Sequence, residues 1–516
     1  MDDDLKQTLK NLFGIDFRSL ALFRIALGFL LLSDSYLRSF DIRAFYTDFG
    51  SLPRISLIEQ FSDTWYFSLH LINGRVEFQA FLLFCSAIAA VCLIAGYRTR
   101  LFTVISWILL TSLHNRNPYI INVGNYFFRM LLFWGMFLPL GGVYSVDSLR
   151  CSQDREKGEC LSVASVALWI QIAIVYLFAV YYRSGPDWHA SGTAIYYALS
   201  SDQMAKPLGH WLLNFPNLLK LLTLLVYWFE AIGPLLLLFP FLVIPGKAVR
   251  VVRMIVVFLF IFFHLGLFFT MDAGLFEWIC VAAMTVFLPG LFWEKAERYR
   301  PKFFGASWVK IKSRIQGLRA TFSGSHATSR GLFIASNGAA FFFLVYILLW
   351  NFSTISPNVR VPKSLMFIAS IFRLDQKWDM FAHPITTDGW YVMPGKLRDG
   401  REVDLWKQGR PVVWQKPDSF YKMYKNEFWQ KFMMVFSGNF VTRERRLLFA
   451  QYLCRDWNAS HAEEKDKLQS FEIYFMAQKI RPGQEKEPPV KNLMWKHYCF
   501  KVPEVVPAKT ADEIQK

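Results

Sequence analysis

Six ionisable side chains interrupt long apolar stretches of this sequence, and they are the first candidates for chemistry: Arg24, Asp34, Arg129, Glu230, His264 and Glu277. A charged side chain at the centre of a bilayer costs about 2.5–3.5 kcal/mol on insertion scales, so each one needs a compensating partner. One interpretation is purely structural and pairs Glu230 with Arg24 or Arg129. The other is a polar cavity in which His264 and Glu277 supply acid and base chemistry.

A second group of candidates follows the apolar stretch that ends at Tyr182, in the sequence Arg-Ser-Gly-Pro-Asp-Trp-His. On the structural interpretation, Arg183, Asp187 and His189 are interfacial and capping residues beside aromatic anchors. On the functional interpretation, the forked donors of Arg183 orient an anion and His189 exchanges protons. The candidates for contact with a cofactor are Arg24, Arg129, Tyr182 and Trp188.

The elements that must position these residues are membrane helices. The chain has 516 residues, of which 54% are apolar and 19% charged, against about 45–50% and 25% in soluble domains. The acidic N-terminus lacks the basic region of a signal peptide, so the first apolar stretch is expected to remain as a helix. Nine stretches could cross a bilayer: Phe17 to Tyr36, Val76 to Ala95, Leu101 to Leu113, Tyr126 to Leu140, Leu161 to Tyr182, Leu218 to Phe239, Val251 to Thr270, Gly274 to Phe292 and Gly331 to Trp350.

The distribution of basic residues predicts the orientation. Nine Lys and Arg residues and one acid lie in the loop of residues 295–330, and such loops face the cytoplasm. Residues 1–16 are then cytoplasmic, 331–350 form the ninth span, and the C-terminal region is extracytoplasmic in a multi-pass protein of a bacterial inner or plasma membrane. The loop is interpreted as a topology signal that contacts anionic membrane lipid. No basic groove with interleaved aromatic residues supports a nucleic-acid site.

The residue pattern changes after Asn351, where hairpin and strand patterns replace the long apolar runs. Asp399-Gly400 is a preferred tight-turn dipeptide between two β-prone runs. Arg443 to Trp457 has helical spacing, while Ser470 to Phe475 and Met494 to Phe500 are typical of strands. We therefore expect one extracytoplasmic α+β domain over residues 352–503, followed by a flexible tail of residues 504–516.

The cysteines of this domain leave two alternatives open. Cys454 and Cys499 form a disulfide, as an oxidising compartment allows, or they are two unrelated buried thiols. No set of residues has the spacing of zinc ligands, so no metal site is expected.

Several motifs resemble one family, the vitamin K-dependent γ-glutamyl carboxylases and their bacterial relatives that share the horizontally transferred transmembrane (HTTM) domain. The similar stretches are Arg24-Ile-Ala-Leu-Gly, Asn115-Arg-Asn-Pro118, Tyr126-Phe-Phe-Arg-Met, Asp187-Trp188, Phe263-His264 and Trp378-Asp-Met-Phe-Ala-His383. The resemblance implies a polytopic α-helical bundle, with an HTTM-like domain of eight spans over residues 17–294 and about nine spans in all. It also implies structural roles for Asp187, Trp378 and His383.

The resemblance points to a catalytic position that this chain has changed. In that family, a lysine at the end of the fifth span deprotonates vitamin K hydroquinone, and the matching residue here is Arg183. Deprotonating a guanidinium, whose pKa is near 13, costs about 8 kcal/mol at pH 7. Arg183 is therefore a poor base but a good clamp for a carboxylate, a phosphate or a quinone oxygen. The family also uses a histidine where Gly124 stands, whereas His264 matches a family histidine.

Two classes of function follow from these expectations. In both, an outward-facing polar cavity binds a lipid- or quinone-like molecule, with vitamin K hydroquinone as the reduced quinone that the resemblance implies, and the outer domain meets an exported peptide. In the first class, the chain is an active carboxylase-like enzyme of the carbon-carbon lyase type. In the second, it is a non-catalytic factor for peptide maturation or lipid binding. The change at Arg183 disfavours true γ-carboxylation.

Overall fold

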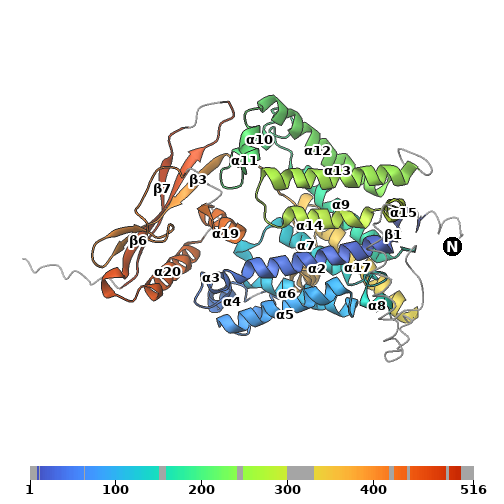
Figure 1. Ribbon diagram of the computed structural model, residues 1–516, viewed down its shortest axis with the longest axis horizontal. Helices are drawn as coiled ribbons and strands as arrows, with labels where there is room; N and C mark the ends of the chain where they lie inside the picture. Colours follow the sequence, from blue (N-terminus) through green and yellow to red (C-terminus); the bar gives the residue numbers. More distant parts are fainter. Residues whose placement is uncertain are drawn as a thin grey trace, which may run out of the picture.

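The computed structural model describes residues 9–10, 12–62, 64–149, 158–240, 248–298, 330–417, 423–438, 442–483 and 487–500. A helix lies at each of the nine predicted apolar stretches within this part of the chain (Figure 1). These helices are α2 (Phe17–Ser39), α5 (Val76–Ala95), α6 (Thr99–Arg116), α7 (Val123–Gly135), α9 (Val163–Tyr182), α12 (Pro216–Leu238), α13 (Ala248–Thr270), α14 (Phe276–Met284) and α17 (Arg330–Ile355).

Not all nine helices qualify as membrane spans. Among the described residues, six are long and apolar enough to cross a bilayer: α2, α5, α9, α12, α13 and α17. A seventh span results if α14, with the 3-10 turn Thr285–Phe287, is joined to α15 (Gly290–Arg298), from which it is bent by 96°. The helices α6 and α7 fall short of this test. Length and composition therefore support a polytopic bundle and not the expected count of nine.

Local sequence signals explain where several helices begin and end. The side chain of Asp16 caps α2 by accepting a hydrogen bond from the backbone of Arg18. Reciprocal capping boxes begin α7 at Asn122 and α9 at Ser162. Helix α5 ends at Gly96, which has a left-handed φ of 69° that a glycine adopts without strain.

Short elements connect the long helices. The helical ones are α3 (Ile42–Tyr46), α4 (Arg54–Gln60), α8 (Val146–Leu149), α10 (Ala194–Ser200), α11 (Pro207–Leu212), α18 (Met366–Phe372) and the 3-10 turns Leu69–Leu71, Pro118–Ile120, Lys363–Leu365 and Glu464–Asp466. Two short strands, β1 (Ile15–Asp16) and β2 (Glu159–Cys160), pair antiparallel and bring the starts of α2 and α9 together.

Further contacts define one end of the bundle, which we call the amino-terminal end. Nη1 of Arg18 lies 2.9 Å from Oε1 of Glu297, so the end of α15 meets the start of α2. Arg253, near the start of α13, donates a hydrogen bond to the carbonyl of Leu12. The opposite end, which we call the domain end, carries the C-terminal domain, so β1 and that domain are at opposite ends of the molecule (Figure 1).

The core of the bundle lies where α2, α7, α9 and α14 meet. Large aromatic side chains fill it, with Trp134 of α7 and Trp169 of α9 fully buried. The ring centroid of Trp169 is 4.7 Å from that of Phe287, in the turn that follows α14. This packing fixes α9, the helix that ends at Arg183, against the rest of the bundle.

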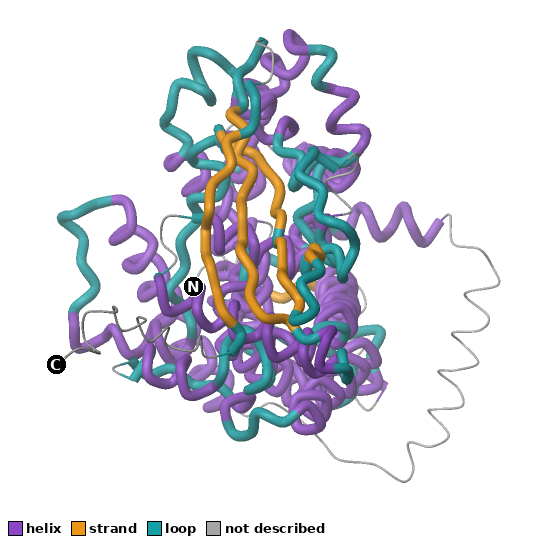
Figure 2. The backbone as a smooth tube through the Cα atoms, turned by 90° about the vertical axis from the view of Figure 1, so that its left-hand side faces the viewer, coloured by secondary structure: helices purple, strands orange, loops and turns teal. Residues whose placement is uncertain are grey.

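The C-terminal domain is built on an antiparallel sheet of five strands (Figure 2). The strands are β3 (Thr387–Val392), β4 (Pro394–Leu397), β5 (Glu402–Asp404), β6 (Leu468–Lys479) and β7 (Val490–Tyr498). β6 pairs with β3, β4 and β7, and β4 also pairs with β5. The predicted turn at Asp399-Gly400 joins β4 to β5, with Gly400 at a φ of 90°. The predicted strands and the predicted helix, α20 (Arg443–Ser460), are confirmed.

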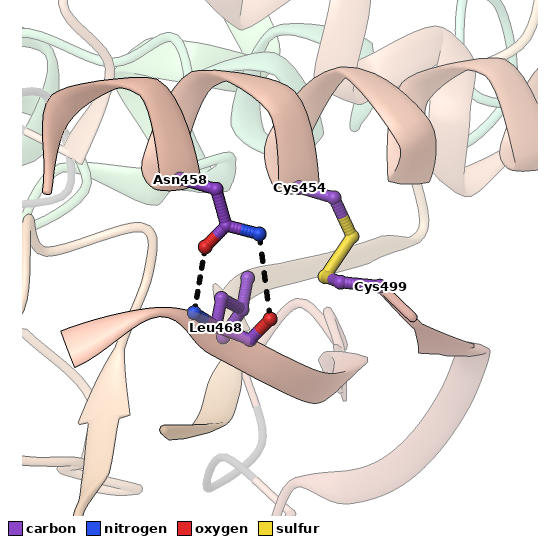
Figure 3. The surroundings of a disulfide bond; sticks show 4 residues. All are labelled: Cys454, Asn458, Leu468 and Cys499. Carbon is purple, nitrogen blue, oxygen red and sulfur yellow. Dashed lines mark hydrogen bonds between the residues drawn. A yellow bond between two sulfur atoms is a disulfide. The ribbon is translucent and has the colours of Figure 1, made fainter. Parts of the chain in front are cut away.

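A disulfide joins this helix to the end of the sheet, because Cys454 of α20 is bonded to Cys499, just after β7 (Figure 3). One turn further along α20, Asn458 accepts a hydrogen bond of 2.7 Å from the backbone nitrogen of Leu468, at the start of β6. Of the two alternatives for the cysteines, the structure contains the disulfide.

The helix α19 (Glu427–Ser437) lies between the sheet and the bundle (Figure 1). The indole nitrogen of Trp429 donates a hydrogen bond of 2.8 Å to Asp41 of the bundle, and Asn426 donates to the same carboxylate. The guanidinium carbon of Arg38 lies 4.4 Å from the ring centroid of Phe428. The C-terminal domain is therefore docked on the domain end of the bundle through polar and cation-π contacts.

The predicted basic loop of residues 295–330 and the tail of residues 504–516 lie outside the described residues, except for residues 295–298 at the end of α15 and residue 330 at the start of α17. Of the predicted N-terminal segment, residues 9–10 and 12–16 are described.

Candidate functional site

A cavity of about 360 Å³ lies between α9, α10, α12, α13 and the segment of residues 380–385. Its wall is almost entirely apolar and includes Ile195, Leu199, Leu219, Leu222, Leu267 and Met271. The sequence had predicted a polar cavity, and this one differs because most of the side chains that α12 and α13 direct into it are aliphatic or aromatic.

Few polar groups line the cavity. Among the described residues that line the cavity, Arg183 and Glu230 are the only ones with a formal charge, and both are buried. Tyr176, His264, Thr270 and Trp188 are uncharged lining residues that also carry a polar atom. An apolar chamber with a few convergent polar groups is the usual form of a small-molecule site.

Arg183 reaches the cavity because it is the cap of α9, where the backbone leaves the helix. Its Nη1 forms an ion pair with Oε2 of Glu230 on α12. Its guanidinium carbon lies 4.5 Å from the ring centroid of Trp188, which also lines the cavity. The expected pairing of Glu230 with Arg24 or Arg129 is therefore wrong: the nearer cation is Arg183.

His264 extends from α13 into the same cavity. Its Nε2 is 2.8 Å from the hydroxyl of Tyr176 on α9, while its Nδ1 has no hydrogen-bond partner within the described part of the chain. The imidazole is therefore held by one nitrogen and has the other one available for a further partner. Arg183 and His264, predicted as a shared site, line one cavity.

Two other predicted catalytic residues lie outside this cavity. Glu277 of α14 is buried, and neither carboxylate oxygen has a hydrogen-bond partner among the described residues. His189 is exposed, and its Nε2 lies 3.0 Å from the carbonyl oxygen of Arg183. The imidazole of His189 thus contacts the backbone that positions Arg183, and not the cavity.

The residues predicted to contact a cofactor are divided among several places. Trp188 lines the cavity and donates its indole N–H to the carbonyl of Phe381, at 2.9 Å. Tyr182 donates instead to the carbonyl of Thr354 on α17. Arg24 lies near the amino-terminal end and donates to four backbone carbonyls: those of Ile94, Leu140, Val143 and Tyr144.

Arg129 of α7 lies in another part of the interior. Its guanidinium carbon is 4.7 Å from the ring centroid of Tyr126, and its Nε and Nη2 have no hydrogen-bond partner among the described residues. Neither Arg24 nor Arg129 lines the cavity that contains Arg183.

The residues predicted to be structural have different environments. Asp187 accepts a hydrogen bond of 2.6 Å from the hydroxyl of Thr193 and so closes the turn after Arg183. Trp378 is fully buried and donates to the side chain of Gln376. His383 is exposed.

From the sequence, Tyr176 belongs to a stretch, Ile174-Val-Tyr176, that resembles the carboxylases, but it was given no role in the site, although its hydroxyl lies 2.8 Å from Nε2 of His264. A signal was present, because Tyr176 lies two turns before Arg183 on the same helix and so shares its face. Spacing along one helix does not reveal a partner on another, however, and the contact with α13 required the fold.

Gly124, at the position where the carboxylases that the sequence resembles have a histidine, has little room for a side chain. A Cβ built on Gly124 would lie 3.2 Å from the backbone of Phe276 and 3.0 Å from the side chain of Asn122. Within the described residues, no group of three or more His, Cys, Asp or Glu side chains could hold a metal ion.

The apolar helices define a multi-pass membrane protein with a C-terminal sheet domain. The family model described as the HTTM domain matches residues 14–291, which is more than half of the chain, and the chain therefore belongs to the HTTM family. No curated protein and no solved structure gives a significant match.

Proposed function

We propose that this HTTM protein binds a membrane-soluble molecule, lipid- or quinone-like, with its apolar body in the cavity and its polar group beside Arg183, Glu230 and His264. The observation that carries the proposal is the composition of the lining: one apolar chamber with its charged groups limited to a single ion pair. The volume of about 360 Å³ lies within the range of about 300–1,000 Å³ that is common for ligand pockets.

The polar end of such a molecule has specific partners. Nδ1 of His264 is buried without a partner in the described part of the chain, and a buried nitrogen of this kind gains a hydrogen bond when a ligand oxygen or hydroxyl reaches it. The guanidinium of Arg183 has five N–H donors, of which the ion pair with Glu230 uses only part. A headgroup oxygen or a quinone oxygen suits both residues.

Binding is a better assignment than carboxylation for this site. The carboxylate of Glu230 stabilises the protonated form of Arg183, because an opposite charge in contact favours the ionised state. The residue at the position of the family's base is thereby kept as a cation. The role that we propose for Arg183 is to orient an anionic or polar group without accepting a proton.

The same proposal includes an extracytoplasmic C-terminal domain, which would meet an exported peptide. Two observations support that placement. The helix ends that carry Arg250, Lys295 and Arg298 lie at the amino-terminal end, opposite the domain, and the positive-inside rule assigns basic residues beside short loops to the cytoplasmic side. The disulfide between Cys454 and Cys499 suits an oxidising compartment.

Photocrosslinking tests the binding site. The full chain is reconstituted in nanodiscs with a short-chain ubiquinone that carries a diazirine, and the labelled peptides are mapped by mass spectrometry. We expect labelling of α12 and α13 at residues that line the cavity. Unmodified quinone should reduce this labelling if the natural ligand is a quinone, and phospholipid should reduce it if the natural ligand is a lipid.

A matched pair of variants distinguishes the cavity from the outer surface. Leu222→Trp fills the chamber and should abolish competable labelling, whereas Leu221→Trp places the same ring at an exposed neighbour that does not line it. Equal labelling of both variants, or labelling that no competitor reduces, would overturn the proposal.

A further inference from the structure

Unpartnered hydrogen-bond donors form a second polar group inside the domain end of the bundle, separate from the cavity of Arg183. It comprises Arg38 at the end of α2, His114 and Arg116 at the end of α6, and Arg129 on α7. All four side chains are buried, with relative exposures of 0–2%.

These residues lie together although they come from three helices. The charges of Arg38 and Arg129 both act on the ring of His114, as does that of Arg373 in the segment after α18. Arg38 and Arg116 both act on the phenol of Tyr46, with which Nη1 of Arg38 makes a hydrogen bond of 2.7 Å. His114 therefore lies near Arg38 and Arg129, and Tyr46 connects Arg38 to Arg116.

The unpartnered atoms in this region are predominantly donors. Within the described residues, no hydrogen-bond partner exists for Nη2 of Arg38, Nε and Nη1 of Arg116, Nε and Nη2 of Arg129, or either ring nitrogen of His114. A buried donor without a partner costs free energy, and guanidinium donors cost more than neutral ones. So many unused donors in one place indicate an acceptor that the protein itself does not supply.

The charge balance leads to the same conclusion. Arg38 is paired with Asp34 at 2.8 Å, and Arg373 with Asp375 at 3.0 Å. Neither Arg116 nor Arg129 forms a contact ion pair with a described carboxylate; Asp48 and Asp375 act on them only from a distance, so neither guanidinium has an anion hydrogen-bonded to it within the described residues. Buried cations are normally paired with an anion.

We propose that Arg116, Arg129 and His114, with the free edge of Arg38, form a binding site for a small oxyanion, either a carboxylate or a phosphate. Forked guanidinium donors match the planar or tetrahedral oxygens of such groups. The site is distinct from the apolar cavity, and it does not depend on whether a lipid or quinone binds there.

Two measurements on the purified full chain test the site. The protein is purified in a neutral detergent and a buffer free of oxyanions. One aliquot is denatured, and the phosphate and carboxylates released per protein molecule are quantified. In a second aliquot, the melting temperature is followed as inorganic phosphate or acetate replaces chloride at constant ionic strength. We expect either one equivalent of anion retained per protein molecule or a saturable rise of several degrees in the melting temperature, because a ligand that binds only the folded state stabilises it.

Variants connect the effect to these donors. Arg129→Gln and Arg116→Gln should each weaken the apparent affinity about 10-fold or more, as expected for the loss of charged hydrogen bonds. The control is Arg253→Gln, since Arg253 is also a buried arginine but donates to the carbonyls of Leu12 and Leu237 at the other end of the bundle. The control should keep the affinity of the wild type.

The source of the anion is decided by comparing free phosphate with short-chain phosphatidylglycerol in the same assay. Phosphate that acts alone indicates a soluble anion, and an effect limited to the lipid indicates a headgroup; both support the site. No retained anion together with equal melting temperatures in every salt would overturn it and would mean that water satisfies the donors. Quinone crosslinking in Arg129→Gln should remain normal. A failure of the oxyanion site can therefore be distinguished from a failure of the proposed quinone or lipid binding.

Discussion

The guanidinium of Arg183 and the carboxylate of Glu230 form a buried ion pair that joins the end of α9 to the middle of α12. The two residues are 47 positions apart in the sequence. This pair sets the polarity of an otherwise apolar cavity, so it determines both the stability of the site and the chemistry that it can perform.

The stability of this pair can be measured with a double-mutant cycle. Arg183→Met or Glu230→Leu alone leaves one buried charge without its partner, which typically costs about 3–5 kcal/mol. The double variant removes both charges, and we expect it to recover most of that loss. The measurement is the melting temperature or denaturant midpoint in detergent; additive losses in the double variant would contradict a direct pair.

The position of Arg183, where the carboxylases that this sequence resembles have a lysine, can be tested by activity. Given reduced quinone, labelled bicarbonate and a glutamate-rich peptide, the wild type should incorporate no label, because a paired guanidinium does not accept a proton at neutral pH. Arg183→Lys serves as the second arm of the experiment. Label in that variant alone would show that the rest of a catalytic site persists, whereas label in the wild type would refute our account of Arg183.

Gly274, between α13 and α14, should not tolerate a side chain. Its φ is 68°, in the left-handed region, and an added Cβ would overlap the carboxylate of Glu427 on α19. Left-handed backbone costs about 1–2 kcal/mol for a residue with a Cβ, and the overlap with Glu427 adds to this. We expect Gly274→Ala to lower the melting temperature by several degrees.

The control for this prediction is Gly483→Ala, because Gly483 has a similar φ of 73° but no heavy atom within 4 Å of an added Cβ. Gly483→Ala should lower the melting temperature only by the amount that a left-handed backbone costs a residue with a Cβ. Combining Gly274→Ala with Glu427→Ala should restore part of the stability; no rescue would mean that Glu427 does not contact this turn.

Glu427 should make the stability depend on pH. Burial is the main cause that raises the pKa of its carboxyl from 4.5 to about 8; Asp34, Asp272 and Glu277 also raise it, whereas Arg38 lowers it. Since the folded-state pKa is above the unfolded one, the stabilising contribution is complete below about pH 4.5 and is lost as the pH rises to about 8. Glu427→Gln stays neutral and should gain melting temperature relative to the wild type over this range.

The exposed residue Glu444, in the same domain, provides the control. Thermal melts at pH 5 and pH 8.5 should show no such gain for Glu444→Gln. A constant difference between Glu427→Gln and the wild type at both pH values would contradict the proposed titration.

Reduction of the disulfide should destabilise the C-terminal domain. Cys454 and Cys499 are 45 residues apart, and a closed loop of that size stabilises by about 4 kcal/mol on the chain-entropy estimate. Cys454→Ser with Cys499→Ser should therefore increase cleavage of the domain by a protease, as dithiothreitol should in the wild type. Cys85→Ser, in α5, is the control and should have no effect on that cleavage.

The sequence predicts the apolar helices well because hydrophobic length is a local property. Each predicted stretch is a helix in the structure, and the turn at Asp399-Gly400 is a local signal of the same kind. The span count is harder, since α6 and α7 are short helices whose environment depends on their neighbours. No local pattern distinguishes a short spanning helix from one buried in protein.

The sequence was enough to predict which residues belong to the candidate site, but not which of them form contacts with one another. Arg183, Glu230 and His264 stand out because polar groups are costly in apolar surroundings. Their partners depend on how the helices are rotated against one another, and this is why Glu230 was assigned to the wrong arginine. The unused donors of Arg116 and His114 were likewise hidden within a polar run at the end of α6.

The walls of the apolar cavity have a consequence for how a ligand would be measured. Away from the cavity, α12 and α13 carry exposed side chains such as Trp228 and Leu259, which suit contact with acyl chains. A ligand that enters between these helices would come laterally from the bilayer. Its concentration there would be set by its partitioning into lipid. Its apparent dissociation constant per litre of water would then rise with the amount of lipid present, whereas the value expressed as a mole fraction of the membrane would remain constant.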